Sequence, residues 1–204
     1  MGLVLLFLAV YLSWDAYALI YPFIGRWSAD VTQYLLKLPL TSYLFEYSLV
    51  SWTVSHSFLH ALMRAVYRAG FVGSFWLPAL YLTFADPERA KGLVIRFAIG
   101  FGILALSFPI FHVHAPHVVY SLPEHYAPND WTARPEFVLP SPHCTLAFIG
   151  LLSILEVRRK ETAPLAVFLA LVPLSTVLLG EHWVWDVMAG FLVALVAVEL
   201  EKRV

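Results

Sequence analysis

Residues 2–24, GLVLLFLAVYLSWDAYALIYPFI, form an apolar run with a single charged side chain, Asp15. At about 1.5 Å of rise per residue, a helix of this length crosses the roughly 30 Å hydrocarbon core of a bilayer. The run is longer than the apolar region of a signal peptide and has no basic flank, so we expect it to be retained as a first spanning helix. It predicts an integral membrane protein.

Similar runs recur along the whole chain of 204 residues. The sequence is 60% hydrophobic and 13% charged, whereas soluble domains have roughly 25% charged residues. Its mean hydropathy is +0.75. We therefore expect a multi-pass, all-α fold, a six-helix transmembrane bundle forming a single domain over residues 1–204. The expected spans are 2–24, 70–86, 92–113, 142–157, 162–180 and 183–200.

Basic residues indicate how these spans are oriented. Lys and Arg gather at 89–96, at 158–160 and at 202–203. With six spans, all three places share one face with both termini, and the positive-inside rule makes that face cytoplasmic. The segments 114–141 and 180–186 then lie on the opposite, non-cytoplasmic face. Because 114–141 is long and rich in Pro and His, we expect it to be an active-site loop.

The stretch 28–66 is the ambiguous part of this topology. A span over 41–63 would place the basic turns on two different faces. We therefore expect an amphipathic surface helix over 28–38, with Ser28 as its N-cap. The remainder is expected to be interfacial or partly re-entrant, because it carries the Trp and Tyr that favour headgroup depth.

Composition also excludes several classes of function. The formal net charge of −1 provides no basic stripe, so no nucleic-acid partner is expected. Cys144 is the sole cysteine, which excludes an internal disulfide and a metal site built on cysteines. The apolar runs make the bilayer itself an expected partner.

Two short segments on the non-cytoplasmic face carry residues suited to phosphate chemistry. Pro140-Ser141-Pro142-His143 opens a helix, whose N-terminus offers free amide groups to an anion. Gly180-Glu181-His182-Trp183-Val184-Trp185-Asp186 opens the last helix and places His182 and Asp186 at positions i and i+4. A carboxylate there can orient an imidazole and make it a nucleophile or base.

These segments, with Ser175-Thr176 between them, resemble the second and third signature motifs of the type 2 phosphatidic acid phosphatase superfamily. The run GEHWVWDVMAG at 180–190 looks like the branch that contains inositol phosphorylceramide synthases and related inositol phosphotransferases. The resemblance covers roughly residues 67–200. It implies six spanning helices, a site at the non-cytoplasmic membrane surface and a lipid phosphate or phospholipid as substrate.

The resemblance also implies roles for particular residues. His182 would be the nucleophile that forms a phosphohistidine, with Asp186 as its orienting carboxylate. His143 would be the general acid that protonates the leaving alcohol, and Ser141 would hold a phosphate oxygen. No metal and no other cofactor is implied, because the nucleophile and the acid are both side chains.

The chain departs from the family pattern in its cations. Thr176 stands where the family has Arg, and it can donate a hydrogen bond but supplies no charge. The first motif is matched only by Arg134-Pro135, with Ala127 in place of its Lys. A phosphoryl transition state still needs positive partners. The expected substrate-binding groups, besides Ser141 and Thr176, are Arg134, Arg68 and His117, with Arg64 and His114 as further candidates.

Several functions are compatible with these residues. With water as acceptor the enzyme would be a lipid phosphatase, and with an alcohol such as inositol it would be a lipid phosphotransferase. A second class is a lipid-binding membrane protein without catalytic activity. A third is a metal-dependent membrane enzyme that uses histidines near 112–125. His56 and His60, expected on one helical face, are a weaker candidate for a metal pair.

Overall fold

The computed structural model describes residues 2–123 and 136–204, and it is 77% helical, which confirms the all-α fold class. Arg134 lies outside the described residues. Two strands of two residues each interrupt the helices. The elements are α1 Gly2–Ile24, β1 Ala29–Asp30, α2 Thr32–Leu35, α3 Tyr43–Ser55, α4 Ser57–Ala85, α5 Pro87–Ser107, β2 Phe111–His112, α6 Pro116–Val119, α7 Pro142–Leu155, α8 Ala163–Leu178 and α9 Val184–Glu201.

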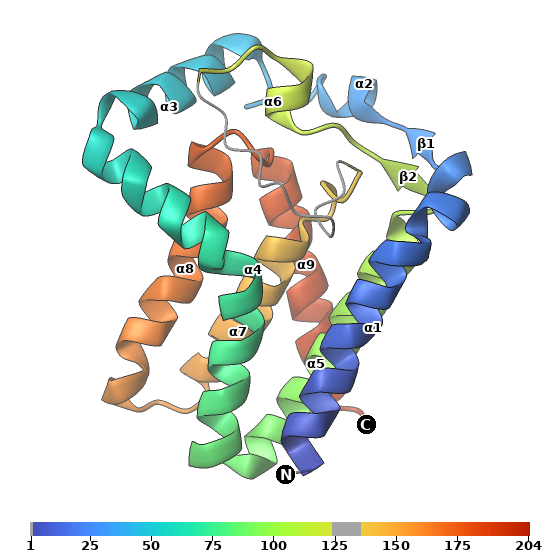
Figure 1. Cartoon of the computed structure of the whole chain (residues 1–204), viewed down its shortest axis with the longest axis vertical. Coiled ribbons are helices and arrows are strands. Elements are labelled where there is room, and N and C mark those ends of the chain that lie inside the picture. Colours follow the sequence, from blue (N-terminus) through green and yellow to red (C-terminus); the bar gives the residue numbers. More distant parts are fainter. Residues whose placement is uncertain (1, 124–135) are drawn as a thin grey trace.

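Helix α7 lies at the centre of the helix body, where it contacts α4, α5, α8 and α9. Helix α1 packs along α5 and α4 on one side (Figure 1). Helix α3 contacts α4 and α8 and, with α6 and the two strands, covers one end of the body. The α4–α5 and α7–α8 turns lie at the other end, on the same side as the N-terminus. The segments predicted to form the site are thus gathered at the end covered by α3 and α6.

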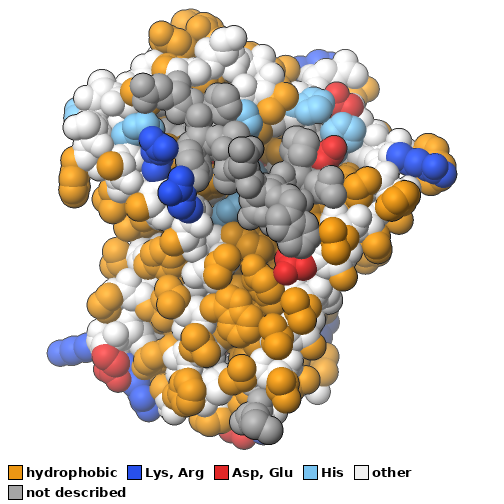
Figure 2. Space-filling view, in the orientation of Figure 1, with side chains coloured by type: hydrophobic (Ala, Val, Ile, Leu, Met, Phe, Trp, Pro, Cys, Tyr) orange, Lys and Arg blue, Asp and Glu red, His pale blue; other side chains and the backbone are white. Residues whose placement is uncertain are grey.

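Within residues 2–123 and 136–204, three helices are long and apolar enough to cross a membrane: Gly2–Trp27, Pro87–Ser107 and Lys160–Leu178. Pro142–Leu155 is a shorter apolar helix. Figure 2 shows hydrophobic side chains over the middle of one face, between charged groups toward both ends. These features are consistent with a membrane protein. The expected spans 70–86 and 183–200 coincide with parts of α4 and α9, but a bundle of six spans stays a prediction.

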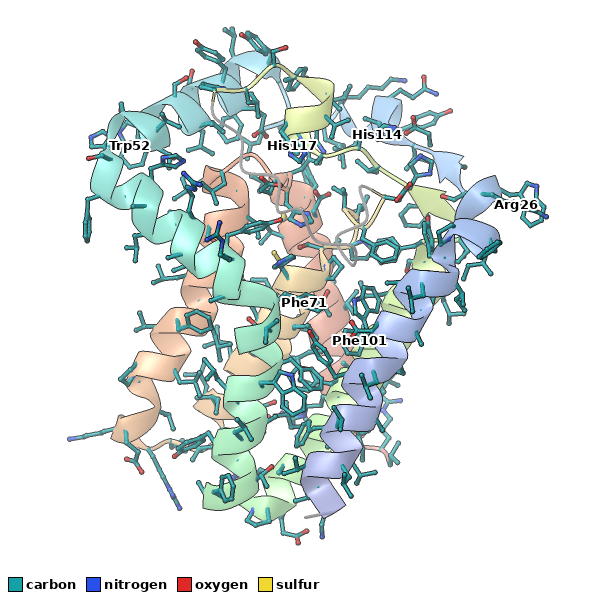
Figure 3. The ribbon with its side chains drawn as sticks, in the orientation of Figure 1. Arg26, Trp52, Phe71, Phe101, His114 and His117 are labelled. Carbon is teal, nitrogen blue, oxygen red and sulfur yellow. The ribbon has the colours of Figure 1, made fainter. Side chains whose placement is uncertain are left out.

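The core between α1, α4 and α5 is built from aromatic rings. Trp14 and Phe101 stack with ring centroids 4.9 Å apart, and Phe75 stacks on Phe97 at 4.5 Å. Figure 3 labels Phe71 and Phe101 in this layer of helices. Burying large rings removes much apolar surface from contact with water or lipid and fixes helix positions by shape. This packing attaches α4, which carries part of the site, to the rest of the body.

The stretch after α1 differs from the sequence-based expectation. A surface helix over 28–38 was expected, but β1 pairs in parallel with β2, and only one helical turn, α2, follows. The amide of Ala29 donates to the Ile110 carbonyl at 3.1 Å, and that of Val31 to the His112 carbonyl at 3.0 Å. These distant backbone partners outcompete a local helix, and the expected N-cap at Ser28 was wrong. For the same reason α5 ends at Ser107, before the expected 113.

The end opposite the site is held by a buried arginine. Arg96 of α5 bonds Glu201 at 3.0 Å and Glu156 at 3.1 Å, and also donates to Ser153 at 2.9 Å. Because these partners come from α7, the residue after it, and α9, the network joins α5 to the ends of α7 and α9. The basic turns predicted to share one face are therefore close together in space.

Candidate active site

Helix α7 begins at the predicted Pro140-Ser141-Pro142-His143 segment. Ser141 is the N-cap, and its hydroxyl accepts a hydrogen bond from the amide of Cys144 at 3.3 Å. Pro142 follows at the first helical position, where a missing N–H leaves no gap in the helix. Ser141 is fully buried. Its hydroxyl starts the helix, and its contact with a phosphate stays a prediction.

The turn between α8 and α9 holds His182 through the main chain. Gly180 has φ of 68°, in the left-handed region that favours glycine. Its amide donates to the Val177 carbonyl at 3.0 Å, and the amide of Glu181 donates to the Thr176 carbonyl at 3.0 Å. This pair of bonds is a Schellman motif, which ends α8. The amide of His182 donates to the same Thr176 carbonyl at 3.1 Å.

His182 and Asp186 face each other across the N-cap Trp183, because α9 begins at Val184 and His182 lies before the helix that was expected to include it. Nδ1 of His182 lies 3.4 Å from Oδ2 of Asp186, which also accepts the amide of Trp183 at 2.8 Å. Both side chains are buried. Burial lowers the pKa of His182 to about 4. A hydrogen bond to the Val138 backbone acts in the opposite direction but is the smaller effect. The imidazole is therefore neutral near pH 7, as a nucleophile requires.

The rings of His143 and His182 lie together, with centroids 6.1 Å apart and planes at 58°. His143 projects from the first turn of α7. Tyr67 of α4 stacks on its ring at 4.9 Å, and Phe71 meets the ring at 5.3 Å. Aromatic side chains of α4 thus orient one imidazole, while the α8–α9 turn orients the other.

Helices α7 and α9 approach each other closely at Gly190. A Cβ at this position would lie 3.0 Å from Cβ of Cys144 and 3.1 Å from both the Ser141 carbonyl oxygen and the Thr145 amide nitrogen. Two of these three atoms belong to the backbone and cannot move aside easily. Glycine at 190 therefore allows the start of α7 to sit against the first turns of α9.

Thr176 is fully buried beneath this site. Its hydroxyl donates to the Pro173 carbonyl at 2.8 Å and lies 3.6 Å from Sγ of Cys144. Its carbonyl holds the amides of Glu181 and His182, as described above. The contact of Thr176 that reaches the site is thus made by its main chain, and phosphate binding by its hydroxyl stays a prediction.

The predicted positive partners lie in different places. His117 of α6 is half-buried, with Nδ1 3.2 Å from the Gly180 carbonyl and 3.5 Å from the Glu181 carboxylate. Figure 3 shows His117 in the segment that covers this end of the molecule. Arg68 is exposed on α4, next to Tyr67, whose ring stacks on His143. The structure therefore brings His117 to the turn before His182 and places Arg68 on the turn of α4 nearest His143.

Glu181 was not assigned a role from the sequence, although it lies within the GEHWVWD run. It is buried, its Oε2 lies 3.5 Å from Nδ1 of His117, and its side chain hydrogen-bonds Tyr67. Burial raises the pKa of Glu181 to about 8. Because Tyr67 also stacks on His143, Glu181 connects the surroundings of His143 and His182. Its position directly before His182 was the one sequence feature that could have indicated a place at the site.

Glu46 of α3 is a second group that sequence analysis missed. It is fully buried, and neither carboxylate oxygen has a hydrogen-bond partner among the residues that the structure describes. Burial and the nearby Asp186 raise the pKa of Glu46 to about 8. Nothing in the local sequence distinguished Glu46 from a surface carboxylate, because its burial comes from the way α3 lies across the site.

The proposed metal pair of His56 and His60 does not form a continuous helical face. His56 lies between α3 and α4, with φ −105° and ψ 82°, outside the helical region. Its Nδ1 instead approaches the Trp52 carbonyl at 2.8 Å. The helix is interrupted at His56 itself, whereas a shared face requires an unbroken helix from His56 to His60. The expectation of one shared face was therefore wrong.

Comparison with known proteins agrees with the family resemblance of the motifs. A family model of the PAP2 superfamily, the type 2 phosphatidic acid phosphatases, matches residues 33–200, so this chain belongs to that superfamily. The match begins before the region covered by the resemblance and includes α3 and all of α4. Membership indicates a phosphatase-type activity.

The chain is also similar to an uncharacterised protein of Methanocaldococcus jannaschii. The two are 27% identical over 189 residues, which cover 86% of this chain and 73% of the relative. Because that protein is uncharacterised, it carries no information on substrate. No solved structure matches the chain at a significant level.

Proposed function

We propose that this chain is a membrane enzyme that removes or transfers the phosphoryl group of a lipid phosphate through a phosphohistidine at His182. One observation carries the proposal: the ring of His143 lies 6.1 Å from that of His182, whose Nδ1 lies 3.4 Å from Asp186. A nucleophile, its orienting carboxylate and a proton donor are thus within reach of one phosphate group.

The reaction would proceed in two steps. With the Nδ1 proton directed at Asp186, Nε2 of His182 attacks phosphorus, and the bond from phosphorus to the lipid oxygen breaks. His143 donates a proton to that oxygen, which leaves as an alcohol. Water then attacks the phosphohistidine, gives its proton to His143 and releases phosphate. The same step with an alcohol as acceptor gives a new phosphomonoester, or a phosphodiester where the group on His182 already carries one ester bond because the substrate was a phosphodiester.

The long apolar helices and the position of the site at one end of them support a lipid substrate at a membrane surface. We propose that all six long helices cross the bilayer, with the basic turns and both termini in the cytoplasm. The site then lies on the non-cytoplasmic face, beneath α3 and α6. Here an acyl chain can remain along the apolar helices while the phosphate reaches the polar end. Exposed Leu5, Leu12 and Phe23 on α1 support contact with lipid.

The acceptor distinguishes two versions of this function. The resemblance of GEHWVWDVMAG to inositol phosphotransferases, together with Thr176 in place of Arg, favours an alcohol such as inositol. Purified protein in detergent can be incubated with phosphatidic acid, with and without inositol. Free phosphate whose yield and rate are unaffected by any alcohol would support the phosphatase version over the transferase.

A non-catalytic lipid-binding protein is the second candidate. The departures from the family pattern favour it, because Thr176 stands where the family has Arg and Ala127 where it has Lys, so cations that would stabilise the transition state are missing. Replacement of His182 by Ala decides between the two. We expect turnover to fall about 10⁴-fold or more, as when a nucleophile is removed. An acid-labile phosphoryl group trapped on the parent but not on His182→Ala would identify the intermediate.

A further inference from the structure

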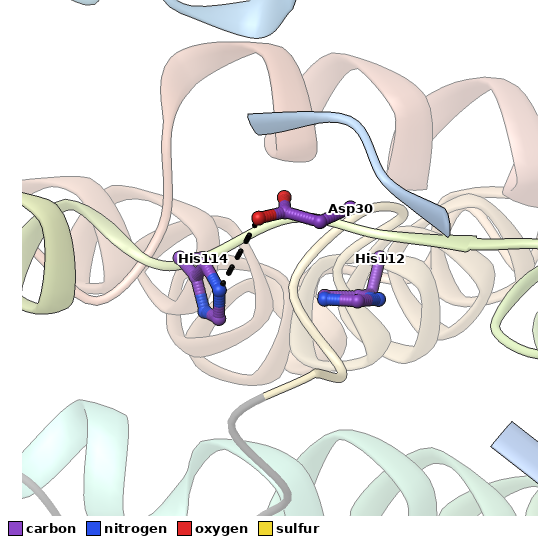
Figure 4. A group of neighbouring side chains, drawn as sticks. All are labelled: Asp30, His112 and His114. Carbon is purple, nitrogen blue, oxygen red and sulfur yellow. Dashed lines mark ion pairs between the residues drawn. The ribbon is translucent and has the colours of Figure 1, made fainter. Parts of the chain in front are cut away.

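Three side chains with metal-binding atoms lie together on the paired strands, outside the histidine site described above. In the parallel pair, Asp30 of β1 is opposite His112 of β2. His114 follows two residues later, so it points to the same side of the extended chain as His112. One ligand atom from each of the three side chains lies within 4.8 Å of the other two (Figure 4).

The separation of the ligand atoms is close to the separation of two ligands on one bound metal ion. Nε2 of His114 lies 3.6 Å from Oδ2 of Asp30. Two ligands held about 2.1 Å from one tetrahedral zinc ion are separated by about 3.4 Å. Small rotations of exposed or half-buried side chains would bring His112 to the same separation. Two imidazoles with one carboxylate form a ligand set that suits zinc and similar divalent transition metals.

Neighbouring groups already orient these ligands. The hydroxyl of Ser28 lies 2.7 Å from Nδ1 of His112, and when Nδ1 donates to it, Nε2 keeps its lone pair for a metal. Oδ1 of Asp30 accepts the amide and hydroxyl of Thr32 at 2.9 and 2.6 Å. Oδ2 is therefore the oxygen that faces His114. Such outer contacts are typical of metal sites, where they fix the orientation of each ligand.

We propose that Asp30, His112 and His114 bind one divalent transition-metal ion, for which zinc is the best match, with water at the remaining position. The site joins the segment after α1 to the segment after α5. Its connection to the rest of the molecule runs through the main chain of His114. The His114 amide donates to the Thr32 hydroxyl at 3.0 Å, and its carbonyl accepts the indole N–H of Trp183 at 2.8 Å.

The proposed ion would have a structural role and would take no part in the phosphoryl reaction. Trp183 follows His182 directly and is fully buried. A metal that fixes His114 would therefore hold Trp183 in place, and with it the start of α9. Since the ion binds only the folded arrangement of β1 and β2, it should raise the temperature of unfolding.

Cobalt titration tests the proposal without relying on enzyme activity. Protein purified in detergent is stripped with EDTA, dialysed and titrated with Co²⁺, and visible absorption reports its coordination. Zn²⁺ is then added to displace it. We expect one Co²⁺ per chain and displacement by Zn²⁺. Asp30→Asn, His112→Gln and His114→Gln should abolish the absorption, and Ser28→Ala should weaken binding about tenfold.

His56→Gln is the matched control, because it removes a histidine from the same end of the molecule without touching the proposed ligands. It should bind Co²⁺ like the parent. Absence of a stoichiometric absorption band in the parent would overturn the proposal even if every variant failed to fold. Equal binding by the parent, Asp30→Asn and His114→Gln would overturn it as well.

Discussion

The amide of Ser141 donates to the carbonyl of Asp186 at 3.3 Å. This bond joins the N-cap of α7 to the first turn of α9, so the two motifs are connected by main-chain atoms as well as by their side chains. The distance between His143 and His182 consequently depends on how closely these two helices approach.

Gly190→Ala tests this dependence. The added methyl group would meet Ser141 and Thr145 backbone atoms at 3.1 Å and push α9 away from α7. We expect a loss of about 1–3 kcal/mol in stability, as in other overpacked cores, and a lower turnover by the molecules that remain folded. Thermal unfolding in detergent and phosphate release from phosphatidic acid measure the two effects.

Gly102→Ala provides the control for that substitution. A Cβ at Gly102, also within a helix, has nothing within 4 Å. Alanine should be neutral or stabilising by up to about 1 kcal/mol there, because it favours the helix. If Gly190→Ala behaved like Gly102→Ala in both assays, the close contact of α7 and α9 would not be needed for activity.

Asp186→Asn should separate the orienting role of this carboxyl from its structural role. Asparagine retains an oxygen for the Trp183 amide, so the start of α9 should persist. It cannot stabilise a protonated or phosphorylated His182 in the same way, and we expect turnover to fall about 10³–10⁴-fold. Steady-state kinetics measures this loss, and circular dichroism checks the fold.

Asp86→Asn is the matched change at the other end of the molecule, where Asp86 caps α5 through the Arg89 amide. It should cost about 1 kcal/mol or less of stability and leave turnover unchanged. Full turnover by Asp186→Asn would remove Asp186 from the proposed mechanism.

Buried Glu46 should make stability depend on pH. Its pKa is raised from 4.5 to about 8, so the folded state keeps the proton that the unfolded state releases. The resulting stability is fully present below pH 4.5 and is lost as the pH rises through 8. Glu181 acts in the same direction. The lowered pKa of His182 acts oppositely, but only between about 4 and 6.5.

Glu46→Gln should therefore flatten the fall in unfolding temperature between pH 6.5 and 8. At pH 8 we expect the free energy of unfolding of the variant to exceed that of the parent by on the order of 1 kcal/mol. Near pH 5 the two free energies should be alike. Thermal unfolding of both proteins across this range is the measurement. Parallel curves would mean that Glu46 ionises as freely in the folded chain as in the unfolded one.

The positive partner of the phosphate can be found by removing Arg68. If its guanidinium binds the phosphate, Arg68→Ala should lower kcat/KM about 10–100-fold, the value of a hydrogen bond to a charged group. Lys37→Ala, an exposed cation that follows α2, should have no such effect. Arg134→Ala applies the same test to the other predicted cation. Unchanged kinetics in both arginine variants would leave His117, Arg64 and His114 as the remaining candidates.

Local signals predicted the parts of the site that are built locally. The Pro140–His143 segment starts a helix as its cap residues indicate. His182 and Asp186 meet as expected, although His182 lies before α9 and the two do not share a helical face. The β1–β2 pairing and the burial of Glu46 could not be predicted in this way. Both depend on contacts between segments far apart in sequence, for which local periodicity contains no information.

The Schellman turn at Gly180 explains how this chain can differ from its family at position 176. The atom that His182 and Glu181 depend on there is a carbonyl oxygen, which every amino acid supplies. Exchange of the side chain at 176 therefore leaves in place the main-chain oxygen that holds the neighbouring histidine. One residue thus combines a side chain that can vary with a backbone atom that keeps the turn intact.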